Sequence, residues 1–255
     1  MRTKGSRSIS VKSKWTKTKW LLADRALRQF VPETKLFTLS SLNDMTGRYK
    51  MVYFKPTGGS GGNGIARIVR TSSRKFRVKK DARTFETSST GSLYGRLKRI
   101  ARGRSYLLQK GIHLQTSGGR PFDFRMTMQK PEKGKWVPSV MFVKLGKPNT
   151  VVTNYHQGGK LALVGETLRR SGYSSGQIER YKMRLRTLGL QTARCFERRS
   201  PRFRELGLDV ALDRTGRLWI LEVNTRPNFY ALKSLRDKSL FRTMVRYGKK
   251  YGRTR

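Results

Sequence analysis

The sequence predicts an α+β fold with one β-sheet in each half of the chain. The runs KMVYFKP, IARIV and KFRVKK in the first half, and FRMTMQK, KWVPSVMFVK and LWILEV in the second, are rich in aromatic and β-branched residues, which is typical of strands. Helical patterns lie at residues 20–30, 92–103, 178–196 and 232–247. Ser174 and Gln177 match a capping box before the third of these helices. Because helices and strands do not alternate regularly, α+β is favoured over a parallel α/β sheet.

The composition indicates a folded and strongly basic protein. Among 255 residues there are 58 Lys and Arg and 15 Asp and Glu, a formal net charge of +43. Four Trp, 10 Tyr and 12 Phe are enough aromatic residues for a packed core, which argues against full disorder. Such a charge favours polyanionic partners, among them nucleic acid, acidic polymers, anionic lipid headgroups and phosphate-bearing ligands.

Cysteine usage and hydropathy bear on the compartment. A single cysteine excludes an internal disulfide and a cysteine-based zinc site. No apolar run reaches the roughly 18 residues of a membrane helix, and the first residues do not develop the apolar core of a signal peptide. We therefore expect no membrane span and a reducing, cytoplasmic compartment.

A glycine-rich connection follows a strand that ends near Lys55. Six of residues 58–64 are Gly or Ser, and the next strand begins directly afterwards. Glycines let a ligand approach the backbone, and successive free N–H groups beside a lysine can hold a phosphate. The pattern is not a Walker A loop, because GxxxxGK[ST] is absent. The alternative is a mobile hairpin tip with a solvated lysine.

Acidic residues are scarce, yet residues 205–222 contain four of the 15: Glu205, Asp209, Asp213 and Glu222. They fall on two predicted strands joined by the turn DRTG. Asp209 can face Glu222 across this hairpin, with Asn224 on the same side, and these oxygen-bearing side chains suit Mg²⁺. The alternative is that Asp209 and Glu222 pair with nearby arginines. We expect Glu205 at the surface and Asp213 in the turn.

These two features together resemble ATP-grasp enzymes. FKP followed by a glycine-rich hairpin resembles the phosphate-binding loop of that superfamily, and DVALDRTGRLWILEVNTRPN resembles its metal-binding hairpin, with 222 − 209 giving the family spacing of thirteen. The segments KWTKTKWLLADRALRQFVPET, LLQKGIHL, GRPFDFRMTMQK and VVTNYHQGGK are similar, in order, to the YheC/YheD group of endospore coat-associated proteins.

The resemblance implies roles for individual residues. It implies that Mg²⁺ is held by Asp209, Glu222 and Asn224, and that Arg125 stabilises the transferred phosphate or an acyl-phosphate. It assigns ATP binding to Lys14, Lys55, Gly59, Ser60, Gly61, Gly62, Gln109, Lys110, Ile112, Asn154, Gly158 and Gly159.

The resemblance also implies an ATP-grasp fold, in which two α+β subdomains clasp ATP. We expect a basic flexible arm at 1–13, a helical segment at 14–48, a lid subdomain at 49–108 and a C-terminal subdomain at 109–255, without most of the usual N-terminal domain.

Two functions follow. The first is a ligase that joins a carboxylate to an amine through an acyl-phosphate, with an acidic peptide or polymer as a candidate acceptor and with association to the endospore coat. The alternative is a non-catalytic basic protein that uses the same frame to bind nucleic acid or spore polyanions.

Overall fold

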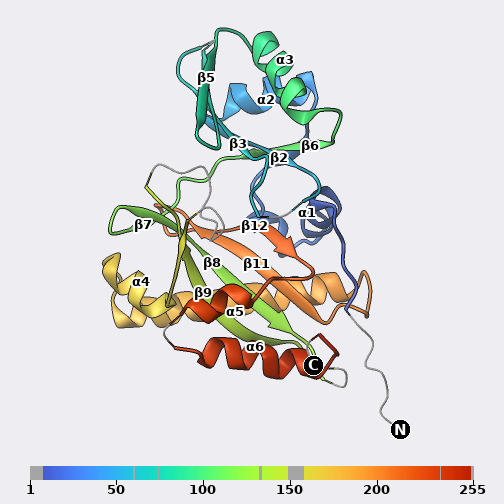
Figure 1. Ribbon diagram of the computed structural model, residues 1–255, viewed down its shortest axis with the longest axis vertical. Helices are drawn as coiled ribbons and strands as arrows, with labels where there is room; N and C mark the ends of the chain where they lie inside the picture. Colours follow the sequence, from blue (N-terminus) through green and yellow to red (C-terminus); the bar gives the residue numbers. More distant parts are fainter. Residues whose placement is uncertain are drawn as a thin grey trace.

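The computed structural model describes residues 8–59, 61–73, 75–131, 134–148, 158–235 and 237–253. The chain forms two lobes, each built on an antiparallel sheet, with the first lobe above the second in Figure 1. The predicted α+β class, with one sheet in each half, is confirmed.

The first lobe is a sheet covered by two helices. Its strand order is β1 (Thr34–Leu36), β6 (Tyr106–Lys110), β2 (Met51–Pro56), β3 (Ala66–Arg70), β4 (Phe76–Lys80) and β5 (Arg83–Thr87). Helices α2 (Leu39–Arg48) and α3 (Thr90–Ala101) pack on it. Alternate residues of β2 are buried, so that Val52 and Phe54 face the helices while Lys55 lies on the other side.

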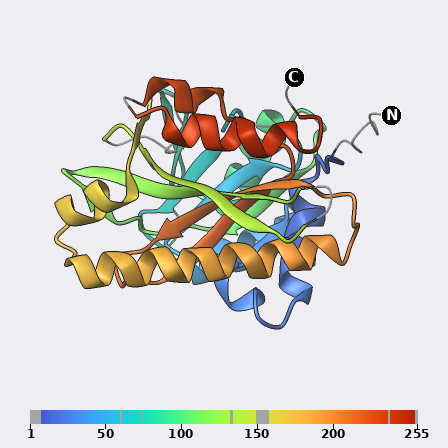
Figure 2. The ribbon, with the colours of Figure 1, turned by 90° about the horizontal axis from the view of Figure 1, so that it is seen from below.

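The second lobe has helices on both faces of its sheet. The strand order is β10 (Lys160–Ala162), β9 (Val137–Leu145), β8 (Arg120–Gln129), β11 (Glu205–Leu212) and β12 (Leu218–Asn224), and β7 (Thr116–Ser117) pairs with β8. Helices α4 (Val164–Arg170) and α5 (Ser175–Glu197) cover one face, whereas the turn η3 (Tyr230–Ser234) and helix α6 (Ser239–Lys249) cover the other (Figure 2).

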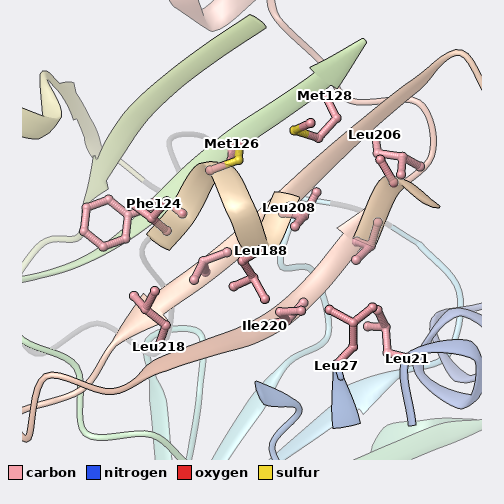
Figure 3. Packing of buried hydrophobic residues seen from close by; sticks show 14 of the residues in the cluster. Leu21, Leu27, Phe124, Met126, Met128, Leu188, Leu206, Leu208, Leu218 and Ile220 are labelled. Carbon is pink, nitrogen blue, oxygen red and sulfur yellow. The ribbon is translucent and has the colours of Figure 1, made fainter. Parts of the chain in front are cut away.

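The main core lies between α5 and the second sheet. Figure 3 shows Leu188 of α5 close to Met126 and Leu208 of the sheet. Since side chains alternate along β11, the residues between its core leucines point to the opposite face. That alternation brings Glu205, Gly207 and Asp209 to the face of η3 and α6.

A helix at the N-terminal end connects the two lobes. Helix α1 (Lys14–Ala23) packs on α5 and β12 and lies beside the junction of the lobes (Figure 1). The prediction of one helix over 20–30 was wrong, because Ser13 caps α1 at its start and Asp24 ends it. The Asp24 carboxylate accepts the backbone N–H groups of Ala26 and Leu27, and a separate turn, η1 (Arg28–Phe30), follows.

The structure confirms one other predicted helix boundary and corrects another. The capping box of Ser174 and Gln177 is confirmed at the start of α5. Instead of one helix over 232–247, the chain forms η3 and α6, because Asp237 accepts the N–H of Ser239 and starts a new helix there. Among the described residues, no helix is both long and apolar enough to cross a membrane.

Candidate active site

The junction of the lobes gathers lysines from the first sheet and from α1. The Lys55 ammonium donates to Gln109 Oε1 at 2.5 Å, and Gln109 in turn donates to Thr34 Oγ1 at 3.1 Å. Burial lowers the pKa of Lys55 to about 8, and smaller effects come from Glu222, which raises this pKa, and from Lys14, which lowers it. Lys55 is therefore a partly desolvated cation that an incoming anion would keep protonated.

Lys14 links the glycine-rich loop to the acidic hairpin. Its backbone N–H donates to Thr57 O at 2.6 Å and its ammonium to Gly59 O at 2.6 Å, and the same ammonium lies 3.3 Å from Glu222 Oε1. Lys17, one turn along α1, lies 3.9 Å from that oxygen, and burial lowers its pKa. The first turn of α1 thus places two buried lysines against one carboxylate.

Adjacent strands of the second sheet supply the opposite wall. The register pairs Arg125 of β8 with Asp209 of β11, and Asp209 with Glu222 of β12. The register shifts between Asp209 and Val210, an irregularity common beside active sites. Because of this bulge, Glu222 faces the cavity although Ile220, two residues earlier, lies in the core.

Asp209 is the centre of a buried ion-pair network. Its carboxylate accepts two bonds from Arg125, at 2.7 and 3.1 Å, and lies 2.9 Å from the Lys144 ammonium. Lys144 also lies 3.0 Å from Asp123. Burial by itself would raise the pKa of Asp209, but the Arg125 and Lys144 cations outweigh it and hold that pKa well below its usual range. For Arg125 and Lys144, burial is likewise outweighed by the acids, and the pKa of each is raised.

A cavity of about 540 Å³ separates the loop from this network. Its walls include Lys14, Gly59, Gly61, Gly62, Arg125, Lys144, Asp209, Glu222, Asn224, Arg226 and Asn228. A smaller cavity of about 20 Å³ is lined by Lys14, Lys17, Lys55, Gln109 and Glu222, among others. Phosphate-binding and metal-binding residue types therefore line two cavities that share Lys14 and Glu222.

The residue types present fit a magnesium ion. Carboxylate and amide oxygens are the hard ligands that Mg²⁺ takes, and Glu222 and Asn224 bring them to the cavity. The Asp209 carboxylate has no acceptor position left for a metal. The bonds from Arg125, Lys144 and, at 3.4 Å, Asn224 Nδ2 use its roughly four acceptor positions. A metal ligand role for Asp209 would therefore cost it one of these bonds, the long one to Asn224 being the weakest. No group of three or more His, Cys, Asp or Glu among the described residues makes a metal cluster.

The comparisons with known proteins agree with this geometry. A family model described as YheC/D like ATP-grasp matches residues 8–254. The chain belongs to this ATP-grasp family. Two relatives from Bacillus subtilis (strain 168) are endospore coat-associated proteins: YheD is 28% identical over 221 residues and YheC 27% over 218. Each match covers 84% of this chain, but only 48% of YheD and 59% of YheC.

A solved structure shows the same ATP-grasp fold. N5-carboxyaminoimidazole synthase from Aspergillus clavatus, in complex with ADP and 5-aminoimidazole ribonucleotide, aligns with a TM-score of 0.54 and 10% sequence identity. The alignment covers 93% of this chain and 51% of that one. At this identity the likeness concerns the fold alone.

The structure of this ATP-grasp chain brings most of the predicted site residues together. Those that line the two cavities are Lys14, Lys55, Gly59, Gly61, Gly62, Gln109, Arg125, Asp209, Glu222 and Asn224. Lys110 is instead placed over the rings of Tyr49 and Trp219, and Ile112 is buried; neither is part of the lining, nor are Gly158 and Gly159. Ser60 and Asn154 lie outside the described residues.

The alternative interpretation of the acidic hairpin holds for Asp209, which pairs with Arg125, whereas Glu222 pairs with Lys14 and Lys17; the metal-ligand role of the hairpin stays a prediction. Asp213 lies in the turn as expected, accepting the N–H groups of Thr215 and Arg217. The expectation of a surface position for Glu205 was wrong. It is 1% exposed and binds Tyr251 at 3.0 Å and Arg253 at 3.4 Å, so it anchors the C-terminal segment.

Three cations of the site were not predicted: Lys17, Lys144 and Arg226. The spacing of Lys14 and Lys17 on one helix face was a signal for Lys17. No sequence signal pointed to Lys144, because the strands that bring it close to Asp209 pair over long distances in the sequence.

The loop that carries Arg226 packs tightly against Gly207. A Cβ built on Gly207 would lie 2.6 Å from Pro227 Cβ.

Proposed function

We propose that this chain binds ATP with Mg²⁺ and uses it to join a carboxylate to an amine through an acyl-phosphate. The observation that most supports this is Lys14, which touches the glycine-rich loop and Glu222 together and so links a phosphate cradle to a metal-ligand hairpin. Membership of the ATP-grasp family and the fold shared with an ADP-bound synthase support nucleotide binding.

The chain's own residues suit each part of such a reaction. Lys14, Lys55 and the loop hold the phosphates and fix their orientation. Arg125, itself held by Asp209, presents a guanidinium to the cavity, where it stabilises charge on the transferred phosphoryl group. Glu222 and Asn224 would hold Mg²⁺, which supplies positive charge to the phosphate oxygens when bound.

The two steps balance without a covalent enzyme intermediate. A carboxylate oxygen of the substrate attacks the terminal phosphorus of ATP, and ADP leaves. The amine then attacks the acyl carbon, phosphate leaves, and the amine's proton passes to solvent. The names of the two relatives support an association with the endospore coat, which we propose as the setting of this activity.

The decisive experiment measures ADP release with ATP, Mg²⁺ and a panel of amino acids and acidic peptides. We expect release that requires both Mg²⁺ and a carboxylate-bearing substrate, with mass spectrometry showing the amide product. A folded chain that shows no ATP binding by calorimetry at low salt would contradict the proposal. It would favour the alternative of a non-catalytic basic protein that binds polyanions.

The low pKa of Lys55 predicts that ATP affinity depends on pH. The free protein carries Lys55 protonated below a pKa of about 8. Phosphates favour the charged form, so affinity is highest below that value and falls by up to roughly tenfold per pH unit above it. Calorimetric titrations on both sides of this pKa check the trend. Lys55→Arg is the control, because arginine stays protonated throughout. A decline of equal size in Lys55→Arg would assign it to another group.

A further inference from the structure

The exposed side of α6 is a row of positive charge. The helix sequence SLFRTMVRYGK contains no acid, and Arg242, Arg246 and Lys249 are exposed at intervals of about one turn. Among the described residues, none of the three forms an ion pair. The opposite side of the helix buries Met244 and packs on β9, so the charged side is left to solvent.

This row leads to the candidate active site. The cavity wall includes Asn228 and Ala231, and Ala231 belongs to η3, which precedes α6 in the chain. Lys233, Asp237 and Lys238 are exposed between the cavity wall and the helix, so this segment keeps a net positive charge, and the Lys238 ammonium donates to the carbonyls of Lys233 and Leu235. Figure 2 shows α6 on the face of the second sheet opposite α5. The charge therefore continues from the helix toward the cavity, where Arg226 stands.

The aromatic rings on this face each contact a cation or another ring. Tyr230 stacks on Phe229 at 4.9 Å, and the Lys233 ammonium lies 5.7 Å from the Tyr230 ring centre. Tyr247 has Arg246 at 5.6 Å and Lys250 at 5.4 Å. Tyr230 is nevertheless 61% exposed, and rings beside cations also occur in sites for single-stranded nucleic acid, so single-stranded DNA is the competing occupant that the test has to separate from an acidic polypeptide.

Membrane binding is disfavoured by the packing of α6. An interfacial helix inserts an apolar face into the lipid. The apolar residues Leu240, Phe241 and Val245 instead pack on the cluster formed by Phe142, Phe229, Leu232 and their neighbours.

An acidic polypeptide needs neither aromatic platforms nor an inserted apolar face. Its alternate side chains repeat at about 6.6 Å in an extended chain, close to the 6 Å or so between residues four apart on a helix.

We propose that the basic side of α6, continued by Lys233 and Lys238, is the docking surface for an acidic polypeptide that delivers a carboxylate to the cavity. The proposal rests on the proposed ligase function, because the reaction requires a carboxylate substrate. It narrows the substrate class from any carboxylate to a chain with repeated carboxylates.

The test compares two variants that lose the same number of charges. One combines Arg242→Gln, Arg246→Gln and Lys249→Gln on α6. The control combines Arg180→Gln, Arg186→Gln and Arg194→Gln, which are exposed on α5 at the other face of the sheet. Binding of a labelled polyglutamate is followed by fluorescence anisotropy at low salt without ATP or Mg²⁺. Duplex DNA, single-stranded DNA and anionic vesicles are measured in parallel.

We expect the α6 variant to bind polyglutamate roughly tenfold more weakly and the α5 variant to stay close to wild type. ATP binding by the α6 variant should be unchanged, which also shows that it is folded. Equal losses of polyglutamate affinity in both variants would overturn the proposal, because binding would then depend on the total positive charge of the protein and not on α6. Tighter α6-dependent binding of DNA or vesicles than of polyglutamate would overturn it as well.

The outcome is separable from that of the ligase proposal. If ATP does not bind but polyglutamate binding depends on α6, the docking surface stands and the ligase falls. If ADP release requires a carboxylate but polyglutamate does not bind through α6, the ligase stands and the docking surface falls.

Discussion

Replacing Glu222 with glutamine is expected to remove Mg²⁺-dependent ATP binding and to lower ADP release by more than about 100-fold. Glu222 contacts only Lys14 and Lys17 as ion-pair partners within the described part of the chain, and both lie on one of its oxygens. It is therefore the carboxylate of the hairpin with the most freedom to bind a cation. Glutamine keeps the shape and removes the charge that the metal needs.

The measurement is calorimetric titration with a non-hydrolysable ATP analogue, with and without Mg²⁺. Glu179→Gln serves as the matched control, because Glu179 is an exposed acid on α5, paired with Lys182 away from the cavity. Glu222→Gln should still fold but should unfold at a lower denaturant concentration than wild type, because Lys14 and Lys17, with side chains 10% and 6% exposed, lose their charged partner. Retention of full Mg²⁺-dependent affinity in Glu222→Gln would remove Glu222 from the metal site.

The parts of the site that the sequence revealed are those where a residue type is rare. Against 58 basic residues, the closely spaced acids Asp209 and Glu222 could be recognised. The run of glycines after Lys55 was equally distinct. Lys17 and Lys144 are buried and lie 3.9 Å from Glu222 and 2.9 Å from Asp209, respectively. Because lysine is so common in this sequence, neither position could be singled out.

Geometry accounts for the rest of the difference. Leu212 pairs with Leu218 beside the turn, and a regular hairpin continuing from there would place Asp209 opposite residue 221. The predicted pairing of Asp209 with Glu222 is present, but it depends on a register shift that has no pattern in the sequence. The contact of Lys14 with Gly59 joins residues 45 apart, and that of Arg125 with Asp209 joins residues 84 apart. Such contacts depend on how the sheets pack, which local propensity does not encode.

Asp209→Asn is expected to destabilise the folded chain by about 3–5 kcal/mol at neutral pH, more than Glu222→Gln does, because Asp209 is the more buried of the two acids. Removing this charge leaves the Arg125 and Lys144 cations buried, with only Asp123 close to Lys144. The side chains of Arg125 and Lys144 are 13% and 8% exposed, so water does little to replace the lost partner.

The pH dependence of this loss has a definite sign. The pKa of Asp209 is lower in the folded protein than in the unfolded chain, where an aspartate has a value of about 3.9. Its stabilising contribution is therefore complete above pH 4 or so and is lost as the pH falls through the folded value. Urea unfolding followed by tryptophan fluorescence, to which Trp136 in the core of the second lobe contributes, should show a gap between wild type and Asp209→Asn that is constant from about pH 5 to 7 and shrinks in acid. A variant as stable as wild type at neutral pH would mean that the network contributes little to folding, and Asp209 would then be explained by metal binding alone.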